Sequence, residues 1–346
     1  MLRTMGGPSH LRVLGAPVVL TGLMLLFALG ASSISGVRGF YLIRAYAGAG
    51  LAITFLSTLI WMFIEIARLA VARAKQPIKR ISSELQDRWK LLILPSIVFP
   101  VFLTAYTTAK TSIFSLAGFE WDQFWADLDF VLFGRDPWRI THALIGPAVS
   151  VAWAWIYSVG WGLALFFSSA FIALFADRRR VATYFASMTA AWLTGGAMLA
   201  YGTSAAGPVF AHLFDPELGA RFEPLRESLA TLLPADNSIR TTQSYLATSA
   251  GTTMAIKGGG ISAMPSMHLA ACTIYVMAAI GNRWLVPTLL FWIIIFVGSV
   301  HFGYHYAVDG LVAAAIAIPC WVAAEAYYRG TASGSQPSPV PQVTAG

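Results

Sequence analysis

Charged side chains are scarce in this sequence. Asp, Glu, Lys and Arg make up 11% of its 346 residues, whereas they make up about a quarter of a typical soluble globular protein. Apolar residues account for 57%, and the mean hydropathy is +0.66. Because so few charges cannot cover the surface of water-soluble domains, the composition excludes that class and predicts a protein without a soluble domain.

Cysteine is also nearly absent, and the excess of basic residues is small. Cys272 and Cys320 lie inside apolar segments, where a free thiol behaves as a small hydrophobic side chain. No disulfide framework is predicted, and the two cysteines do not determine the redox compartment of the protein. The net charge is +7, but Lys and Arg gather at the ends of apolar segments, as membrane-topology signals do. This pattern argues against nucleic-acid binding.

What the sequence does contain is a series of apolar segments of about 20 residues, the length that crosses the hydrocarbon of a bilayer. We expect an all-α, multi-pass transmembrane helical bundle. It has about eight spans, at residues 12–35, 46–70, 91–108, 150–175, 181–201, 266–280, 285–303 and 304–327.

Two basic connections predict the orientation of these spans. The loop after the second span carries six Lys or Arg against two acidic residues, and the fourth span ends at Asp177–Arg180. Short basic loops stay in the cytoplasm, so both termini are predicted to be cytoplasmic. Residues 110–146 mix aromatic with charged side chains, which suits interfacial helices on the extracytoplasmic side. Within them, we interpret Asp127 and Asp129 as a solvated helix face rather than as metal ligands.

The most informative stretch runs from Ser262 to Gly310. It contains Pro265-Ser266-Met267-His268 and, later, His305-Tyr306-Ala307-Val308-Asp309. Asp309 is the only Asp, Glu, Lys or Arg between Arg283 and Glu325. A carboxylate inside an apolar segment costs a few kcal/mol without a partner and marks a candidate functional site. His305, one helical turn before Asp309, is the predicted partner.

The predicted topology places His268, His305 and Asp309 at the same outer surface of the membrane. There, Asp309 can orient one ring nitrogen of His305 and leave the other free to attack. His268 can act as a general acid on a leaving oxygen. Ser266 and the amides of Lys257–Gly260 can bind an anion, as helix starts and glycine-rich turns do.

Two other interpretations of the same residues remain open. His301, His305 and Asp309 are spaced as zinc ligands along one continuous helix face, which predicts that chelation abolishes activity. Gly303 and the expected turn between the last two spans weaken that hypothesis. Alternatively, His305 and Asp309 form a proton relay in a transporter or lipid-binding protein. The internal symmetry that many transporters show is not evident here.

These motifs resemble the type 2 phosphatidic acid phosphatase superfamily, which includes the vanadium haloperoxidases. The family's second motif, PSGH, is here PSMH. Its third, SRxxxxxHxxxD, keeps His305 and Asp309 but has Ser299 at the position of the arginine. The first motif, KxxxxxxRP, is not found. Its expected location is Gly207–Pro208, with Val209 where a basic residue is expected.

The departures resemble the branch of inositol phosphorylceramide synthases, or inositolphosphotransferases, whose third motif reads H-aromatic-x-x-D. The segment from Asp122 to Trp138 is also similar to that branch, and the resemblance covers about residues 90–325. It implies that His305 forms a phospho-histidine, with Asp309 as orienter and His268 as acid. No metal and no cofactor are implied. The missing arginine leaves three candidate substrate-binding cations: Lys257, Lys110 and Arg240.

The resemblance therefore implies a metal-independent membrane enzyme of lipid metabolism, with lipids as its partners and no nucleic acid. We expect transfer of a phospho-head-group to a lipid alcohol, with hydrolysis of a lipid phosphate as the alternative. The expected organisation is a two-span segment with a basic loop (1–90), a six-span catalytic core (91–328) and a disordered tail (329–346). Short loops suit a bacterial inner membrane, with the site on the extracytoplasmic face.

Overall fold

The computed structural model describes residues 8–333, and the prediction of an all-α protein is confirmed over this range. The described residues contain no strand and one isolated bridge, between Arg38 and Met254. The helices that run along the bundle are α1 (His10–Ser35), α2 (Ile43–Val71), α4 (Phe99–Ala117), α7 (Pro147–Trp155), α8 (Trp161–Phe175), α9 (Arg178–Ala191), α14 (Met267–Ala279), α15 (Leu285–His301) and α16 (Ala307–Ser333).

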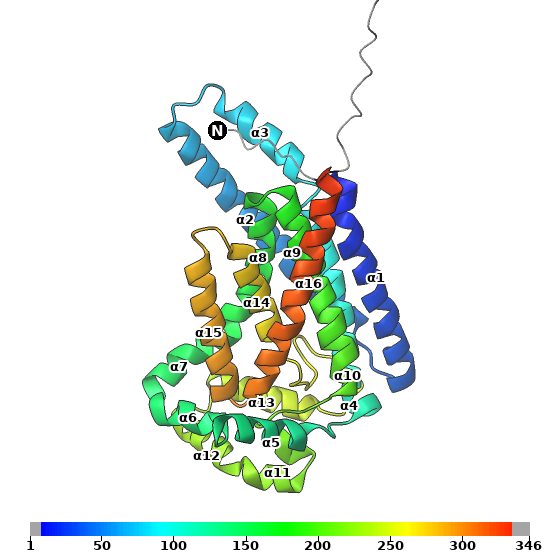
Figure 1. The fold of residues 1–346 in the computed structure, drawn as a ribbon, viewed down its shortest axis with the longest axis vertical. Coiled ribbons are helices and arrows are strands. Elements are labelled where there is room, and N and C mark those ends of the chain that lie inside the picture. The colour runs from blue at the N-terminus through cyan, green and yellow to red at the C-terminus, as the bar shows by residue number, and fades with distance from the viewer. Residues whose placement is uncertain (1–7, 334–346) are drawn as a thin grey trace, which may run out of the picture.

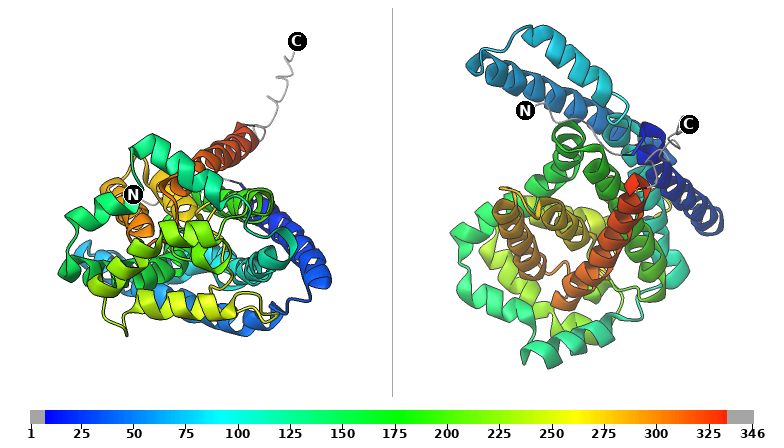
Figure 2. Two further views of the ribbon diagram at one scale, coloured as in Figure 1. Left: turned by 90° about the horizontal axis from the view of Figure 1, so that it is seen from below. Right: turned by 45° about the horizontal axis from the view of Figure 1, so that its top comes forward.

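Shorter helices complete the chain. They are η1 (Phe40–Leu42), α3 (Pro77–Arg88), α5 (Asp122–Phe133), α6 (Pro137–Leu144), α10 (Ala200–Gly202), η5 (Ala211–Leu213), α11 (Pro216–Arg221), α12 (Glu223–Leu232) and α13 (Ser238–Ser249). The described residues also contain three π-helical segments, η2 (Leu94–Val98), η3 (Ile156–Gly160) and η4 (Trp192–Leu199). The segment η2 leads directly into α4, η3 joins α7 to α8, and η4 joins α9 to α10. Figures 1 and 2 show α5, α6 and α11–α13 lying across one end of the bundle.

Within residues 8–333, five helical segments are long and apolar enough to cross a membrane. They are His10–Ser35, Phe40–Val71, Leu94–Ala117, Pro147–Phe175 and Ala307–Arg329. Met267–Ala279 and Leu285–His301 are apolar but shorter. The stretch predicted as a fifth span is continuous helix from Arg178 to Gly202 and is largely buried. These helices fit an integral membrane protein, and the number of about eight spans stays a prediction.

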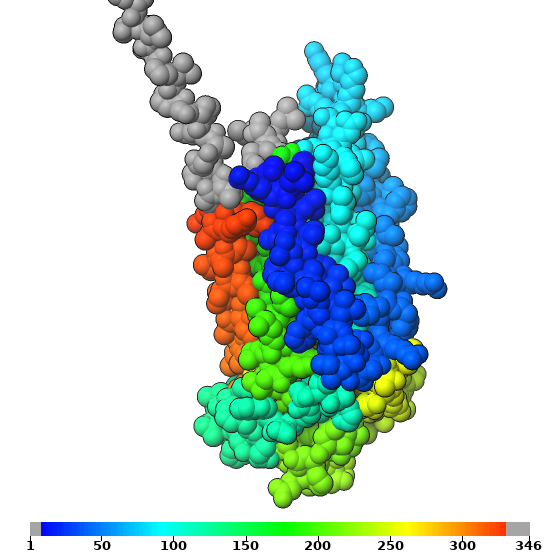
Figure 3. Space-filling view, turned by 90° about the vertical axis from the view of Figure 1, so that its right-hand side faces the viewer, coloured from blue at the N-terminus to red at the C-terminus, as the bar shows by residue number. Residues whose placement is uncertain are grey.

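The bundle is graded from a packed centre to an apolar outer surface. In the most apolar part of Leu94–Ala117, 72% of the residues are buried, against 22% in Phe40–Val71. Helix α1 packs on α4 and α9, and Figure 3 shows it on the outside of the bundle, between α16 and α2. Its outward side chains, such as Val19 and Leu26, are exposed. Exposed apolar side chains on span-length helices are what contact with lipid requires.

The two basic connections that the sequence places in the cytoplasm meet at one end of the bundle. Arg178, which starts α9, forms an ion pair with Asp87 on α3. Arg88 is buried and donates from Nη1 to the carbonyls of Ala173 and Ala176, each at 3.2 Å. Arg88 thereby satisfies carbonyls that the end of α8 leaves free. This end is opposite the one covered by α5 and α11–α13 (Figure 1).

The C-terminal prediction falls partly outside the structure. Helix α16 continues past Arg329 to Ser333, so the first residues of the expected disordered tail are helical. Residues 334–346 lie outside the described residues. The division of the chain near residue 90 stays a prediction.

Two glycines of α2 allow a test of the packing. A Cβ at Gly50 would lie 2.6 Å from Cγ of Pro100 and 3.0 Å from the carbonyl oxygen of Pro95, whereas nothing lies within 4 Å of a Cβ at Gly48. Gly50→Ala is expected to lower the free energy of unfolding by about 1–3 kcal/mol, because the added methyl group would overpack the contact with these prolines. Gly48→Ala is the control and should be neutral or stabilising. Thermal unfolding in detergent measures both, and equal melting temperatures would contradict the packing.

Candidate active site

The residues singled out by the sequence come together at the end of the bundle that α5 and α11–α13 cover. His268 lies in the first turn of α14, and His305 lies in the turn between α15 and α16. The centroids of the two imidazole rings are 5.8 Å apart, with their planes at 68°. Both rings can therefore flank one small group.

Hydrogen bonds define the orientation of the His305 ring. Nδ1 lies 2.7 Å from the carbonyl oxygen of Ala263 and 3.2 Å from Oδ2 of Asp309. A carbonyl oxygen can only accept, so Nδ1 carries the proton. Among the described residues, no group bonds to Nε2. The lone pair of Nε2 is thus available to an electrophile, as a base–orienter pair requires.

Asp309 lies on the first turn of α16 and is fully buried. Its Oδ2 accepts the backbone N–H of Tyr306 at 3.0 Å in addition to facing His305. Its Oδ1 has no partner among the described residues. Its backbone carbonyl accepts the N–H of Ser266 at 3.2 Å, which ties the two motifs together. A carboxylate so placed stabilises positive charge that develops on the His305 ring.

Aromatic rings, rather than hydrogen bonds, hold His268. The centroid of the Trp161 ring lies 4.0 Å from that of the His268 ring. The Tyr157 ring stacks on the imidazole, with centroids 5.1 Å apart and planes at 13°. Both rings come from the helix that starts at Pro147. Within the described part of the chain, neither ring nitrogen of His268 has a hydrogen-bond partner. Both nitrogens are therefore free to exchange a proton with a bound group.

Ser266 is the residue that precedes α14, and its hydroxyl is buried. The Ser266 Oγ has no partner among the described residues. A buried hydroxyl without a partner costs about 1–3 kcal/mol. This hydroxyl is therefore suited to donate a hydrogen bond to an acceptor atom of a ligand. The first N–H groups of a helix have no partner within the helix, and those of α14 lie on the same turn as Ser266.

The structure separates the three candidate cations. Lys110 on α4 is half-buried and lies within electrostatic range of both His268 and His305. Gly260 lies against it, because a Cβ there would be 3.1 Å from Cγ of Lys110. Lys257 is exposed. Arg240 lies on α13, where its Nη1 donates to the carbonyl of Leu233 at 3.1 Å, and it lines a separate groove.

The metal alternative requires an unbroken helix, and the helix is broken. Helix α15 ends at His301, Gly303 has a φ of +70°, and α16 begins at Ala307. The ring of His301 bonds instead to Ser150 (2.9 Å) and Thr141 (3.2 Å). Among the described residues, no group of three or more His, Cys, Asp or Glu side chains is arranged to hold a metal ion.

Two aspartates of α5 support the site, and the sequence analysis missed both. Asp122 accepts the backbone N–H groups of Ala206 (2.7 Å) and Gly207 (2.9 Å) and the hydroxyl of Tyr306 (2.8 Å). Asp129 accepts the N–H groups of Ala307 (2.7 Å) and Val308 (3.0 Å).

The interpretation of α5 as having a solvated acidic face was wrong for Asp129, which is buried, while Asp127 is exposed and pairs with Arg221. Asp122, Ala126 and Asp129 are spaced i, i+4 and i+7, which places them on one helix face. That spacing is the feature of the sequence that could have predicted that Asp122 and Asp129 share one buried face.

The segment expected to hold the family's first motif lies beside this cluster. Gly207 has a φ of +91°, and a Cβ there would lie 2.5 Å from the carbonyl oxygen of Tyr304. Both facts require glycine at this position. The backbone N–H of Val209 donates to the carbonyl oxygen of Gly303 at 2.9 Å. The Gly207–Pro208 turn thus packs directly on the turn that carries His305.

The sequence matches one known protein family. The sequence profile of the PAP2 superfamily matches residues 135–323, which is more than half of the chain. The chain belongs to the PAP2 superfamily. Members of this superfamily are generally phosphoesterases, which supports an enzyme. The matched range includes His268, His305 and Asp309 and begins after Lys110 and α5. No curated protein and no solved structure matches the chain.

Burial gives Asp129 a pH dependence that can be measured. Burial raises the pKa of Asp129 to about 7, against the effect of the two N–H groups that it accepts. The ordinary value is about 3.9. The folded protein therefore holds this proton more tightly than the unfolded chain, and this contribution to the free energy of unfolding falls as the pH rises from about 4 to about 7.

Asp129→Asn is expected to remove this part of the pH dependence, whatever its effect on overall stability. Thermal unfolding in detergent between pH 4 and pH 8 measures the slope. Asp127→Asn is the matched control, because Asp127 is exposed and its hydrogen bonds to Gln123 and Arg221 lower its pKa. Identical slopes for the wild type and Asp129→Asn would contradict the assignment.

Proposed function

We propose that the protein is a membrane lipid phosphotransferase that works through a phospho-histidine at His305. One observation carries the proposal: the proton of His305 is fixed on Nδ1 by Ala263 and Asp309, and Nε2 is left free beside His268. This is the arrangement that an imidazole nucleophile needs. Membership of the PAP2 superfamily supports phosphorus as the electrophile.

In the first half of the proposed reaction, Nε2 of His305 attacks the phosphorus of a lipid phosphodiester. The N–P bond forms as the bond from phosphorus to the leaving lipid oxygen breaks. That oxygen takes a proton from His268 and departs as an alcohol. Asp309 stabilises the positive charge on the His305 ring, and the head group remains attached to the phosphoryl group on the enzyme.

In the second half, a lipid alcohol takes the place of the departed one. His268, now neutral, accepts the proton of its hydroxyl group, and the oxygen attacks phosphorus. The new P–O bond forms as the N–P bond breaks, and the free Nε2 of His305 is restored. Water in the acceptor position would give hydrolysis instead, which is the alternative function.

The charge on the transferring group needs fixed positive partners, because the phosphoryl transition state is stabilised mainly by electrostatics. Ser299, at the arginine position of the family motif, donates its hydroxyl to the carbonyl of Phe296 within its own helix at 2.7 Å. We therefore assign the cationic role to Lys110, assisted by the Ser266 hydroxyl and the start of α14.

The proposal includes a membrane orientation. Residues 91–328 form the catalytic core, and the helices α5, α6 and α11–α13 lie at the extracytoplasmic surface. Eight crossings then alternate in direction and leave both termini in the cytoplasm. The meeting of Arg178 with Asp87 and the capping of α8 by Arg88, at the end opposite the site, support this orientation.

The decisive experiment incubates purified protein with a phospholipid labelled in its head group, with and without a lipid alcohol. A new labelled phospholipid that requires the alcohol is the expected result. Release of free phosphate or a free phospho-head-group, with or without alcohol, would instead establish hydrolysis.

His305→Ala is expected to abolish turnover and the acid-labile, head-group-labelled adduct on the protein. Asp309→Asn is expected to lower kcat by about 10²–10⁴-fold, because the imidazole loses its orienting charge. His10→Ala is the matched control, since His10 lies at the other end of the bundle beside Asp87. Turnover retained by His305→Ala would exclude the mechanism. Proton-coupled lipid transport without chemistry would favour the transporter alternative.

A further inference from the structure

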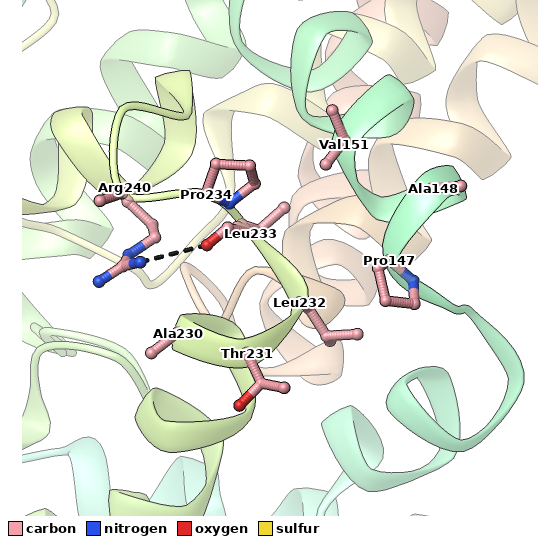
Figure 4. A pocket seen from close by; sticks show the side chains of 10 residues that line it. Pro147, Ala148, Val151, Ala230, Thr231, Leu232, Leu233, Pro234 and Arg240 are labelled. Carbon is pink, nitrogen blue, oxygen red and sulfur yellow. Dashed lines mark hydrogen bonds between the residues drawn. The ribbon is translucent and has the colours of Figure 1, made fainter.

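A groove opens at the end of the bundle that carries the candidate active site. It is a groove of about 570 Å³ between the first turns of α7 and the end of α12 with the start of α13. Figure 4 shows Ala148 and Val151 on one side, Arg240 on the other, and Leu232 and Leu233 between them. The volume is in the range of small-molecule sites.

Among the described residues, Arg240 is the only charged one that lines this groove. Its Nη1 donates to the carbonyl of Leu233 (Figure 4), and this fixes the direction of the side chain. Within the described residues, no carboxylate forms an ion pair with Arg240, whereas Arg221 at the same end is paired with Asp127 and Asp136. Most of the guanidinium is therefore available to an anion in an otherwise mainly apolar groove.

One wall of the groove continues into an exposed apolar surface that suits contact with lipid hydrocarbon. Helix α7 opens the span-length segment Pro147–Phe175. Farther along this segment the outward side chains are large, apolar and exposed, among them Trp155, Val159 and Leu163. An amphiphile whose head lies at Arg240 can therefore extend its chain along this face without leaving an apolar environment.

The other wall connects the groove to the site. The carbonyl of Ile239, next to Arg240, accepts the hydroxyl of Tyr304 at 3.3 Å, and Tyr304 precedes His305. Ser238 bonds to Ser158 at 2.9 Å, beside the Tyr157 ring that stacks on His268. The groove thus adjoins both catalytic candidates while holding neither.

We infer that this groove binds an anionic phospholipid, with its phosphate on Arg240 and an acyl chain along the outer face of α7. A positive charge at the head of an apolar groove fits an anionic lipid rather than a zwitterionic one, whose ammonium group would approach the same guanidinium. The role of this lipid, as the substrate waiting beside the site, rests on the proposed function. Its binding does not, and it can be measured without turnover.

The test uses the full-length protein in dodecyl maltoside micelles and phosphatidylglycerol that carries a fluorophore on one acyl chain. Unlabelled phosphatidylglycerol should displace the probe, whereas phosphatidylcholine and inorganic phosphate should displace it poorly. Arg240→Gln should weaken binding about tenfold or more, because a charge-assisted hydrogen bond is lost. Arg240→Lys should retain most of the affinity.

Two further variants separate the groove from its surroundings. Ala230→Trp fills the groove from an exposed position and should weaken binding while Arg240 is intact. Arg44→Gln, an exposed arginine at the start of α2 at the same end, should bind like the wild type. Melting temperatures close to that of the wild type identify variants that have folded.

The outcomes distinguish the groove from the proposed function. Weaker binding by folded Arg240→Gln and Ala230→Trp supports the groove, and His305→Ala should bind the lipid normally. Equal displacement by phosphatidylcholine, equally effective displacement by phosphate, or wild-type affinity in Arg240→Gln would each overturn it. Loss of turnover in His305→Ala bears on the phospho-histidine alone, so either proposal can fail without the other.

Discussion

The site depends on two buried carboxylates that accept backbone N–H groups. Asp129 takes the two amides that open α16, and Asp122 takes those of Ala206 and Gly207. A helix start has amides without intrahelical partners and a partial positive charge, so a carboxylate there is favourable. One helix, α5, thereby fixes two segments that are about 100 residues apart in the chain.

The chemistry proposed for His305 follows from that constraint. The ring keeps its proton on Nδ1 only while the carbonyl of Ala263 and the carboxylate of Asp309 stay within hydrogen-bond distance. Asp309 lies on the first turn of α16, which Asp129 holds in place. Moving that turn by about 1 Å would misalign the proposed nucleophile, and small misplacements of reacting groups cost large factors in rate. The support of the ring therefore extends well beyond its own motif.

The positions of the basic side chains near the candidate active site cannot be read from the order of residues in the sequence. The motif position for an arginine holds Ser299, whose hydroxyl is used inside α15. Lys110, the proposed cation, lies within electrostatic range of both histidines and comes from α4, a helix outside the matched family region. Arg240 lies in the neighbouring groove instead. These cations come from segments that are far apart in the chain, because each helix presents only one face to the centre of the bundle.

The sequence by itself determined the helical class, the membrane character and the pairing of His305 with Asp309. Hydropathy and i, i+4 spacing are local properties, and a lone carboxylate in an apolar segment requires a partner nearby. The tertiary structure alone decided that Asp129 is buried, that Arg240 lies in a separate groove, and that Trp161 and Tyr157 pack on His268. Those facts depend on which helix faces meet, and packing between distant segments sets that choice.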